Sequence, residues 1–405
     1  MTDPDAEELA ERVREGELRL HELEEHADHE TAATARRRYL ESETGVSLET
    51  TGAYAFPAER ADPNVENMIG GTQIPTGVVG PLPVEGSSAS GDYHLPLATT
   101  EGALVASVNR GASVLRSAGG VTTRVLKSGM TRAPVFRVSG VAEAATVVEW
   151  VGENEERLAE RAEETTSHGE LLGIEPYVVG DNVFLRFLFD TKDAMGMNMV
   201  TIATETACYL VEEETPASLV ALSGNLCTDK KPAAINAIQG RGRTVAADAL
   251  IPRETVVERL HAAPEAIAEA NTRKNLIGSA KAGSLGFNAH AANVVAAAFL
   301  ATGQDGAQVV EGANAITTAE ARTEGLYVSV TFASLEVGTV GGGTKLPTQA
   351  EALSLLGLRG GGDPPGSNAD ALAEVIAAGA LCGELSLLGA LASRHLSSAH
   401  AELGR

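Results

Sequence analysis

The sequence predicts an α+β protein in which a smaller domain is inserted into a larger one. Between residues 134 and 222 the pattern runs strand, helix, strand, strand, helix, an order typical of ferredoxin-like units and not of doubly wound sheets. This stretch contains no GxGxxG turn, so it gives no support to a Rossmann fold. Two later helical patterns are apolar nearly all round, which predicts that they are buried.

The N-terminal residues 5–42 are charged and helix-forming, and they predict one or two helices that pack on something larger. His21, His26 and His29 lie here among Asp and Glu residues. Their spacing suits no common metal-binding motif, so we expect a solvated surface and no metal site.

The next segment, from Asn64 to Pro83, is rich in Gly and Pro, which predicts irregular backbone of the kind that often contacts ligands. A helix is then expected from about Glu101 to Ala118, with Glu101 in its first turn. Gly119 and Gly120 would end that helix.

The predicted strands of the inserted part cover residues 134–141, 175–180 and 182–191. One charged helix is expected over 147–168, and a second should begin near Asp193. The two apolar helical patterns cover 281–308 and 369–396.

Composition excludes several classes of protein. The chain has 405 residues, with 31 basic against 55 acidic side chains and a formal charge of −24, which disfavours nucleic acid and anionic membrane surfaces as partners. Three cysteines without a CxxC pair favour neither a disulfide framework nor a thiolate zinc site. The acidic start lacks the apolar core of a signal peptide, and the best candidate for a membrane span, 282–304, is interrupted by polar residues. We therefore expect a soluble cytoplasmic protein.

The basic residues are unusual, because only seven of the 31 are lysine. An acid-rich, lysine-poor chain suits a cytoplasm full of salt, where screening over roughly 3 Å at 1 M removes self-repulsion. We therefore expect a halophilic source and an activity that falls when salt is removed.

Four ionisable positions are candidates for chemistry, although each has a plainer interpretation. Glu101 could simply compensate a helix dipole. Lys230, with its neighbour Lys231, could clamp an oxyanion or phosphate, or could belong to a solvated turn. Asp305 could merely end a helix, and His400 could be a surface residue near the chain end.

A glycine-rich run from Gly338 to Lys345 invites comparison with a phosphate-binding loop. A Walker A motif needs GxxxxGK[ST], and here Thr344 stands between Gly343 and Lys345. We therefore interpret the run as a glycine loop that can approach a ligand with its backbone amides, but not as a P-loop.

Several strings together resemble one family. ENMIGGTQIPTGVVGPL, ATTEGALVASVNRG, DAMGMNM, SGNLCTDKKPAAIN, GFNAHAAN, GQDGAQ and GTVGGGT are similar to the motifs of 3-hydroxy-3-methylglutaryl-coenzyme A (HMG-CoA) reductase, in the family's order from about Asn64 to His400. The form with Met197 and the DKK string resembles class I, in its soluble archaeal type. The resemblance implies reduction of HMG-CoA to mevalonate with two NADPH, the committed step toward isoprenoids.

The resemblance also implies roles for the four candidates. Lys230 would stabilise the oxyanion formed when the thioester accepts hydride. His400 would protonate the departing CoA thiolate. Glu101 would protonate the mevaldehyde oxygen, and Asp305 would orient and tune both Lys230 and Glu101.

Further residues carry over by motif. The residues that would hold the hydroxymethylglutaryl group are Arg132, Ser223, Asp229, Lys231, Lys274 and Asn293, and those on the CoA side are Ser107, Asn109 and Arg110. The residues that would contact the nicotinamide cofactor are Asp193, Met195, Gly196, Met197, Asn198, Ser167, His168, Gly341, Gly342 and Arg405. The family usually has a basic residue where His168 stands, which bears on the preference for NADPH over NADH. We do not expect the phosphorylatable serine of the animal enzymes here, nor the control that it gives.

The family further implies a helical N-terminal segment (1–50), a large substrate-binding domain around a long buried helix (51–133 and 223–405) and a small NADP-binding domain (134–222). Its active sites would form between subunits of a homodimer or homotetramer, where one chain's Lys230 loop faces the partner chain's glutamate. The alternatives are an NAD-linked, mevalonate-degrading form of the same enzyme, a nucleotide-dependent transferase that uses the loop 338–345, and an inactive structural homologue.

Overall fold

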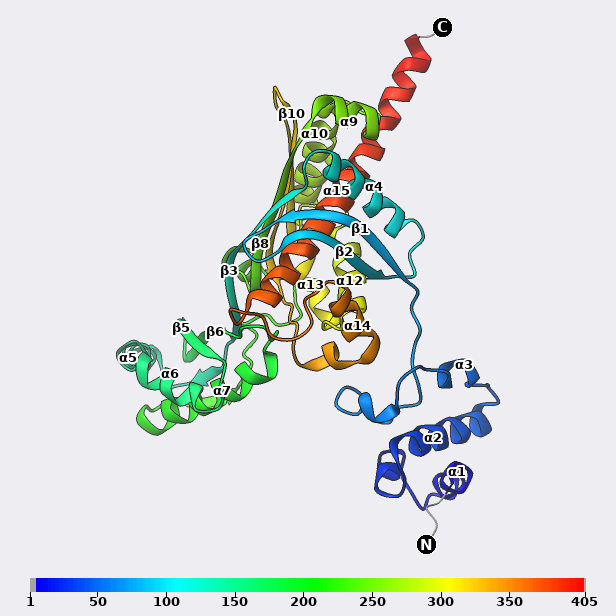
Figure 1. The fold of residues 1–405 in the computed structure, drawn as a ribbon. Helices are drawn as coiled ribbons and strands as arrows, with labels where there is room; N and C mark the ends of the chain where they lie inside the picture. Colours follow the sequence, from blue (N-terminus) through cyan, green and yellow to red (C-terminus); the bar gives the residue numbers. More distant parts are fainter. Residues whose placement is uncertain (1–4, 404–405) are drawn as a thin grey trace.

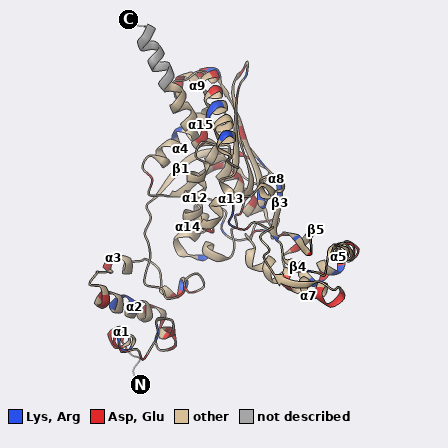
Figure 2. Cartoon of the chain, turned by 180° about the vertical axis from the view of Figure 1, so that it is seen from behind, with Lys and Arg blue, Asp and Glu red and all other residues tan. Residues whose placement is uncertain are grey.

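The computed structural model describes residues 5–403, with side chains up to residue 393. A ten-stranded, mostly antiparallel sheet forms its centre, and helices pack around it, so the protein is of mixed α+β type (Figure 1). Charged residues gather on outer helices, whereas the long helix at the centre carries few of them (Figure 2).

The N-terminal helices lie apart from the large sheet, at the end of an extended segment (Figure 1). They are α1 (Ala6–Arg14), η1 (Leu20–Glu25), α2 (His29–Thr44), α3 (Glu49–Gly52) and η2 (Ala58–Arg60). Leu9, Leu23 and small alanines of α2 form a miniature core of their own, and Met68 with its neighbours packs on Leu346. The predicted helices are confirmed, and no group of three metal-binding side chains occurs among residues 5–393.

The large part of the sheet surrounds the core. Its strands are β1 (Thr76–Glu85), β2 (Ser90–Ala98), β3 (Val121–Arg132), β8 (Gly242–Pro252), β9 (Ala315–Ala321) and β10 (Gly325–Leu335). Strand β3 joins the two parts of the sheet, because its first half pairs antiparallel with β8 and its last three residues pair with β6 (Asn182–Asp190). This shared strand fixes how the two parts meet.

The remaining strands belong to a smaller unit. They are β4 (Val135–Arg137), β5 (Glu170–Val179), β6 and β7 (Ser218–Ala221), and they pair antiparallel in the spatial order β7-β4-β6-β5. The helices of this unit are α5 (Val141–Glu153), α6 (Glu155–Glu163) and α7 (Met197–Glu214). A separate apolar cluster from Met130 to Ala217 fills the space between sheet and helices. The predicted charged helix therefore exists, but it breaks at Asn154 into two.

The other helices pack on the large sheet. They are α4 (Leu104–Ser117), α8 (Ala234–Gln239), α9 (Arg253–Leu260), α10 (Pro264–Ala270), the π-helix η3 (Asn271–Gly278), α11 (Ser279–Ala282), α12 (Ala291–Thr302), η4 (Gly306–Gln308), α13 (Val309–Gly312), η5 (Gly342–Lys345), α14 (Pro347–Leu355) and α15 (Ser367–Leu403). Helix α15 runs through the middle of the core, as the sequence predicts for 369–396 (Figure 1).

The sequence pattern favoured 282–304 as the best candidate for a membrane span, but in the structure the longest apolar stretch lies in helix α15. Its residues Ser367–Ser393 are the one helix of the described chain that is long and apolar enough to cross a membrane, and 83% of its most apolar window is buried inside the protein. Two buried glutamates of α15 accept backbone hydrogen bonds. Glu374 receives the N–H groups of residues 87–89, and Glu384 receives those of residues 289 and 290. Burial of the stretch thus fits a core helix.

The prediction of irregular backbone up to Pro83 is wrong for residues 76–83, which belong to β1. A register shift between Val79 and Leu82 admits the Gly80–Pro81 pair, and Asn109 bonds the Gly80 N–H (3.1 Å) and the Val78 carbonyl (3.0 Å). A side chain from α4 therefore supplies the hydrogen bonds that the bulged strand lacks.

Two predicted helices begin later than expected. Helix α4 starts at Leu104 because Ala103 has a left-handed φ of +69°, and so Glu101 precedes the helix instead of lying in its first turn. The pattern 281–308 yields a long helix only over α12, because residues 283–290 are irregular and Phe287 bridges to β9. The Gly119–Gly120 end of α4 is confirmed, since both have positive φ.

The contact between α4 and α15 depends on Gly111. A Cβ atom there would lie 2.0 Å from the carbonyl oxygen of Cys382, so Gly111→Ala must push the two helices apart and should lower the free energy of unfolding by at least about 2 kcal/mol. Gly152 in α5 has open space around its Cα, so Gly152→Ala should instead raise stability by about 0.5–1 kcal/mol. Urea titrations of both variants in concentrated KCl measure this, and equal effects would contradict the packing.

Candidate functional site

The Lys230 loop, residues 222–233 between β7 and α8, is under backbone strain. Asn225, Thr228 and Lys230 all have φ in the left-handed region, at +63°, +50° and +61°. Each such residue costs roughly 1–3 kcal/mol and persists only where its surroundings hold it, as they often do at active sites. The predicted polar loop is therefore confirmed.

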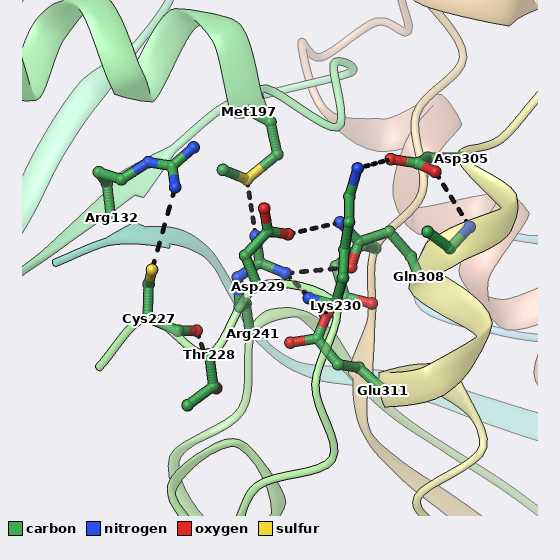
Figure 3. A network of polar contacts seen from close by, with 12 residues as sticks. Arg132, Met197, Cys227, Thr228, Asp229, Lys230, Arg241, Asp305, Gln308 and Glu311 are labelled. Atoms are coloured by element: carbon green, nitrogen blue, oxygen red, sulfur yellow. Dashed lines mark hydrogen bonds and ion pairs between the residues drawn. The ribbon is translucent and has the colours of Figure 1, made fainter. Parts of the chain in front are cut away.

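Lys230 and Asp305 form an ion pair, with 2.9 Å between Nζ and Oδ2 (Figure 3). Their side chains remain 46% and 31% exposed, so the pair adds little stability, and the ammonium stays accessible to a ligand. Asp305 caps η4 through the N–H of Ala307 (3.0 Å), which fixes its carboxylate. The structure thus presents a fixed and partly exposed cation on this loop.

Arg241 lies fully buried below this loop and contacts each neighbouring motif. It bonds Asp229 at 3.0 Å, Gln308 at 3.1 Å and Glu311 at 2.8 Å, and it also contacts the sulfur of Met197 (Figure 3). One guanidinium therefore holds the Lys230 loop, the Asp305 turn and the first residue of α7 together.

Asp229 is held as a carboxylate. Burial alone would raise its pKa, but a hydrogen bond from Gln308 (2.9 Å) and the positive charges of Arg241 and Lys230 lower the pKa below its ordinary value. Lys231 bends back to the Asp229 carbonyl at 3.1 Å. Asp229 is half-buried and Lys231 exposed, so both remain within reach of a bound molecule.

Arg132 lies at the end of β3, beside the same loop. It donates to the Thr201 hydroxyl of α7 at 2.7 and 3.1 Å, and its Nη1 lies 4.0 Å from the Cys227 sulfur. Ser223 lies 3.5 Å from that sulfur. Burial alone would raise the pKa of Cys227, but hydrogen bonds including that of Ser223, and the charge of Arg132, lower it.

Glu101 and Asn293 line a hollow of about 250 Å³ between β2 and α12. The Glu101 side chain is exposed, and its backbone N–H bonds the Thr99 hydroxyl at 3.0 Å. Within the described part of this single chain, no hydrogen bond or ion pair joins Glu101 to Lys230 or Asp305. The structure thus brings together Lys230 with Asp305, and Glu101 with Asn293, as two separate groups.

Asp193, a predicted cofactor residue, has its carboxylate occupied. It accepts four backbone N–H groups, from Gly362, Gly366, Asn368 and Ala369, at 2.7–3.0 Å. The side chain is 5% exposed. It therefore anchors the segment that leads into α15, and any effect on a cofactor would act through that position.

The predicted cofactor motif, residues 193–198, and the glycine loop lie side by side. The N–H groups of Thr339 and Val340 bond the Asp193 carbonyl, and a Cβ on Gly338 would lie 2.4 Å from the Met195 nitrogen. Gly196, at φ +90°, caps α7, Met197 is buried on Arg241, and Asn198 is exposed. The last four residues of the run, Gly342–Lys345, form η5, a short 3₁₀ turn, and the order of Gly343, Thr344 and Lys345 departs from the Walker A pattern.

Gly341 and Gly342 both have positive φ, and open space surrounds their Cα atoms. The backbone there can therefore approach a ligand closely. Ser167 and His168 are exposed on the loop between α6 and β5.

The three residues predicted to lie on the CoA side have partners within the chain. Ser107 and Arg110 bond Ser386 of α15, at 2.9 and 3.0 Å, while Asn109 serves β1. Lys274 is exposed on η3, 3.4 Å from the Asn275 amide oxygen. His400 falls on the last part of α15, for which the structure describes no side chains. Arg405 lies outside the described residues altogether.

Sequence reasoning missed the residues that support the site. Arg241, Gln308, Glu311 and Glu336 were not singled out, although GRGR places an arginine between two glycines. Their burial depends on strands and helices far apart in the chain, which no local pattern displays.

A strained loop that presents a lysine–carboxylate pair beside a glycine turn is the arrangement of an enzyme that stabilises developing negative charge. The family model described as hydroxymethylglutaryl-coenzyme A reductase matches residues 32–405. The chain therefore belongs to the HMG-CoA reductase family.

Similar proteins agree with this assignment. The chain is 72% identical to the 3-hydroxy-3-methylglutaryl-coenzyme A reductase of Haloferax volcanii, over 99% of this chain and 100% of the relative. It is 68% identical to that of Halobacterium salinarum (99% of both chains) and 55% identical to that of Pyrococcus abyssi (98% and 99%). The fold resembles the class II reductase of Streptococcus pneumoniae bound to NADPH, with a TM-score of 0.67, 21% identity, and coverage of 92% and 100%.

The four hydrogen bonds of Asp193 give a test of its role. Asp193→Ala leaves four N–H groups without their acceptor and should lower the free energy of unfolding by about 3 kcal/mol. Asp181→Ala, in an exposed turn, serves as the control. Urea unfolding and steady-state kinetics of both variants decide the matter. A raised KM for NADPH at unchanged stability would show that Asp193 contacts the cofactor directly.

Proposed function

We propose that this chain reduces HMG-CoA to mevalonate and free CoA with two NADPH, the committed step toward isoprenoids. The observation that carries the proposal is the Lys230–Asp305 ion pair, fixed at 2.9 Å in a strained loop. Membership of the reductase family supports the reaction. The alternatives of a transferase and of an inactive homologue gain no support, since the loop 338–345 lacks the P-loop form and the matched polar residues are present.

Lys230 acts in the first reduction. Hydride addition to the thioester carbonyl places negative charge on its oxygen, and a cation already in position stabilises that charge without having to reorganise. Asp305 keeps the ammonium aimed, and Asp229, held ionised by Arg241, balances the charge of the loop. Arg132, Ser223, Lys231 and Lys274 would bind the hydroxymethylglutaryl group, whose carboxylate attracts cations.

The following proton transfers fall to His400 and Glu101. The departing CoA thiolate needs a proton, and an imidazole titrates in the right pH range to give it. The mevaldehyde oxygen then needs a proton during the second reduction, for which we assign Glu101. Asn293, which lines the same hollow as Glu101, would orient the substrate there.

NADPH supplies the hydride when bound. The open, positive-φ turn at Gly341 and Gly342 beside the Met195–Met197 segment fits a bound cofactor, because its backbone leaves the space that side chains would fill. His168 is exposed where a 2′-phosphate partner is expected, so an NAD-linked, mevalonate-degrading direction is the second candidate. The ratio of kcat/KM for NADPH and NADH distinguishes the two.

We infer that the domains follow the limits 1–50, 51–133 with 223–405, and 134–222, the last being a ferredoxin-like cofactor domain. The separate apolar clusters and the β7-β4-β6-β5 order support this division. We further propose that the chain is the soluble, class I type of the enzyme and works in a salt-rich cytoplasm, which agrees with the formal charge of −24.

The active site is proposed to form between subunits of a homodimer or homotetramer. Glu101 makes no hydrogen bond or ion pair with Lys230 in the described part of one chain, yet the reaction needs both near one substrate. A second copy of the chain can supply the missing group through a two-fold axis.

Lys230→Ala tests the reaction and its key residue together. Removing the fixed cation should lower kcat by about 100-fold or more while leaving the urea midpoint nearly unchanged, because the ion pair is partly exposed. The assay follows NADPH oxidation and CoA thiol release with HMG-CoA in concentrated KCl. Wild-type protein should consume two NADPH for each thiol.

The control is Lys281→Ala, because Lys281 is exposed on α11 and forms no hydrogen bond or ion pair with the described residues of the Lys230 loop; it should retain wild-type turnover. Near-normal turnover of Lys230→Ala would remove Lys230 from the mechanism. Oxidation of mevalonate with NAD and CoA, and no reduction with NADPH, would favour the degradative direction.

A further inference from the structure

Two buried glutamates both contact the Nη1 atom of Arg241, and neither has a role in the proposed mechanism. Glu311, of α13, and Glu336, just after β10, are both fully buried. Their carboxyl oxygens lie 2.8 and 3.4 Å from Arg241 Nη1. Arg241 carries one positive charge against these two fully buried carboxyl groups, so the charges of the three sum to zero only if one carboxyl group keeps its proton. Asp229, which also bonds Arg241, is partly exposed and has Lys230 as a second positive neighbour.

The hydrogen bonds indicate which group that is. Glu311 accepts from Asn236 at 2.6 Å, from Arg241 at 2.8 Å and from the backbone N–H of Lys230 at 3.4 Å. Three donors favour the ionised form of a carboxylate. Glu336 accepts one longer bond from Arg241, and its Oε2 has no partner among the described residues. Glu336 Oε2, which has no hydrogen-bond partner among the described residues, is therefore the oxygen that we expect to carry the proton.

We propose that Glu336 is a positioning residue of the reductase site: as a neutral carboxylic acid it lets Glu311 and Arg241 pair, and so holds Lys230 in place. The inference rests on the proposed role of Lys230. Glu336 would act on Lys230 through Glu311, which accepts a hydrogen bond from the backbone N–H of Lys230. The backbone of Lys230 has a strained, left-handed φ and so needs such support.

The charged groups around the pair fit this arrangement. The titratable and charged residues that face Glu336 and Glu311 or lie beside Arg241 are Asp229, Lys230, Arg186, Cys227 and Arg241 itself. Burial first, and then the negative charge of Glu311, raise the pKa of Glu336 well above its ordinary value, against the attraction of Arg241. Ionisation of Glu336 at high pH would therefore set two anions against one guanidinium and disturb the Lys230 loop.

The test uses Glu336→Gln, which keeps the shape of the neutral acid but cannot ionise. At pH 7 its kcat should stay within about threefold of wild type, because the replaced group was already neutral. At alkaline pH the wild type should lose activity through an ionisation that Glu336→Gln lacks. A loss of more than about tenfold in kcat at pH 7 in a folded variant would overturn the proposal, since it would mean that Glu336 works as an anion.

Infrared spectroscopy supplies a readout that does not depend on activity. Wild-type protein at pH 7 should show the carbonyl band of a protonated carboxylic acid, and Glu336→Gln should lack it. The matched control is Glu374→Gln, which alters another fully buried glutamate whose oxygens accept backbone N–H groups. It should keep the band. A band that persists in Glu336→Gln would refute the protonated state, even if Lys230 proves to have another role.

Stability gives a third comparison with a defined sign. A folded-state pKa raised above the unfolded value of about 4.5 stabilises the protein fully only below that pH, and the stabilisation is lost as the pH rises toward the folded-state pKa. The ratio of the unfolding constant of wild type to that of Glu336→Gln should therefore increase about tenfold per pH unit, from about pH 5 up to the folded-state pKa of Glu336. A ratio that does not change with pH contradicts the proposal.

Should Glu336→Gln fail to fold, Glu311→Gln decides. Without the charge of Glu311, Glu336 is left alone with Arg241 and should ionise, so the infrared band should vanish from this variant too. A band that remains in Glu311→Gln would refute the claim that the negative charge of Glu311 keeps Glu336 protonated.

Discussion

The buried guanidinium of Arg241 is the interaction on which the site depends. It bonds Asp229 of the Lys230 loop, Gln308 of the turn that carries Asp305, and Glu311 beneath both, and it contacts Met197 at the start of α7. A planar group with several donors can hold partners that come from separate elements, which a lysine cannot do. The strained backbone of the loop, with three non-glycine residues at positive φ, remains in place because these contacts outweigh its cost.

Other contacts connect the large part of the sheet with the small unit. Strand β3 pairs first with β8 and then with β6, and Arg132 at its end bonds Thr201 of α7. The carboxylate of Asp193 fastens the chain before α7 to the segment that begins α15. The small unit is therefore attached beside the Lys230 loop, where we propose that substrate and cofactor meet, so a change in its position would affect Lys230 directly.

Local patterns were enough to predict the α+β class, the strands β5 and β6, the buried helix α15 and the polar loop around Lys230. The exceptions have physical causes. Strand β1 contains Gly80 and Pro81, which local rules assign to turns, but Asn109 from α4 completes its hydrogen bonds. The carboxylate of Asp193 was expected at the cofactor, yet backbone N–H groups about 170 residues away occupy it. Arg241 went unnoticed because burial, and not its neighbours in sequence, gives it its role.

The central claim is that one chain's Lys230 works with the Glu101 of a partner chain, and mixed dimers test it most directly. Glu101→Gln and Lys230→Ala chains with different affinity tags would be coexpressed, and the species carrying both tags assayed for NADPH oxidation with HMG-CoA in concentrated KCl. Each parent should be nearly inactive. The mixed dimer retains one intact site of two, so it should regain about half of the wild-type activity. A mixed dimer as inactive as both parents would place the two residues in the same chain's site and contradict the account.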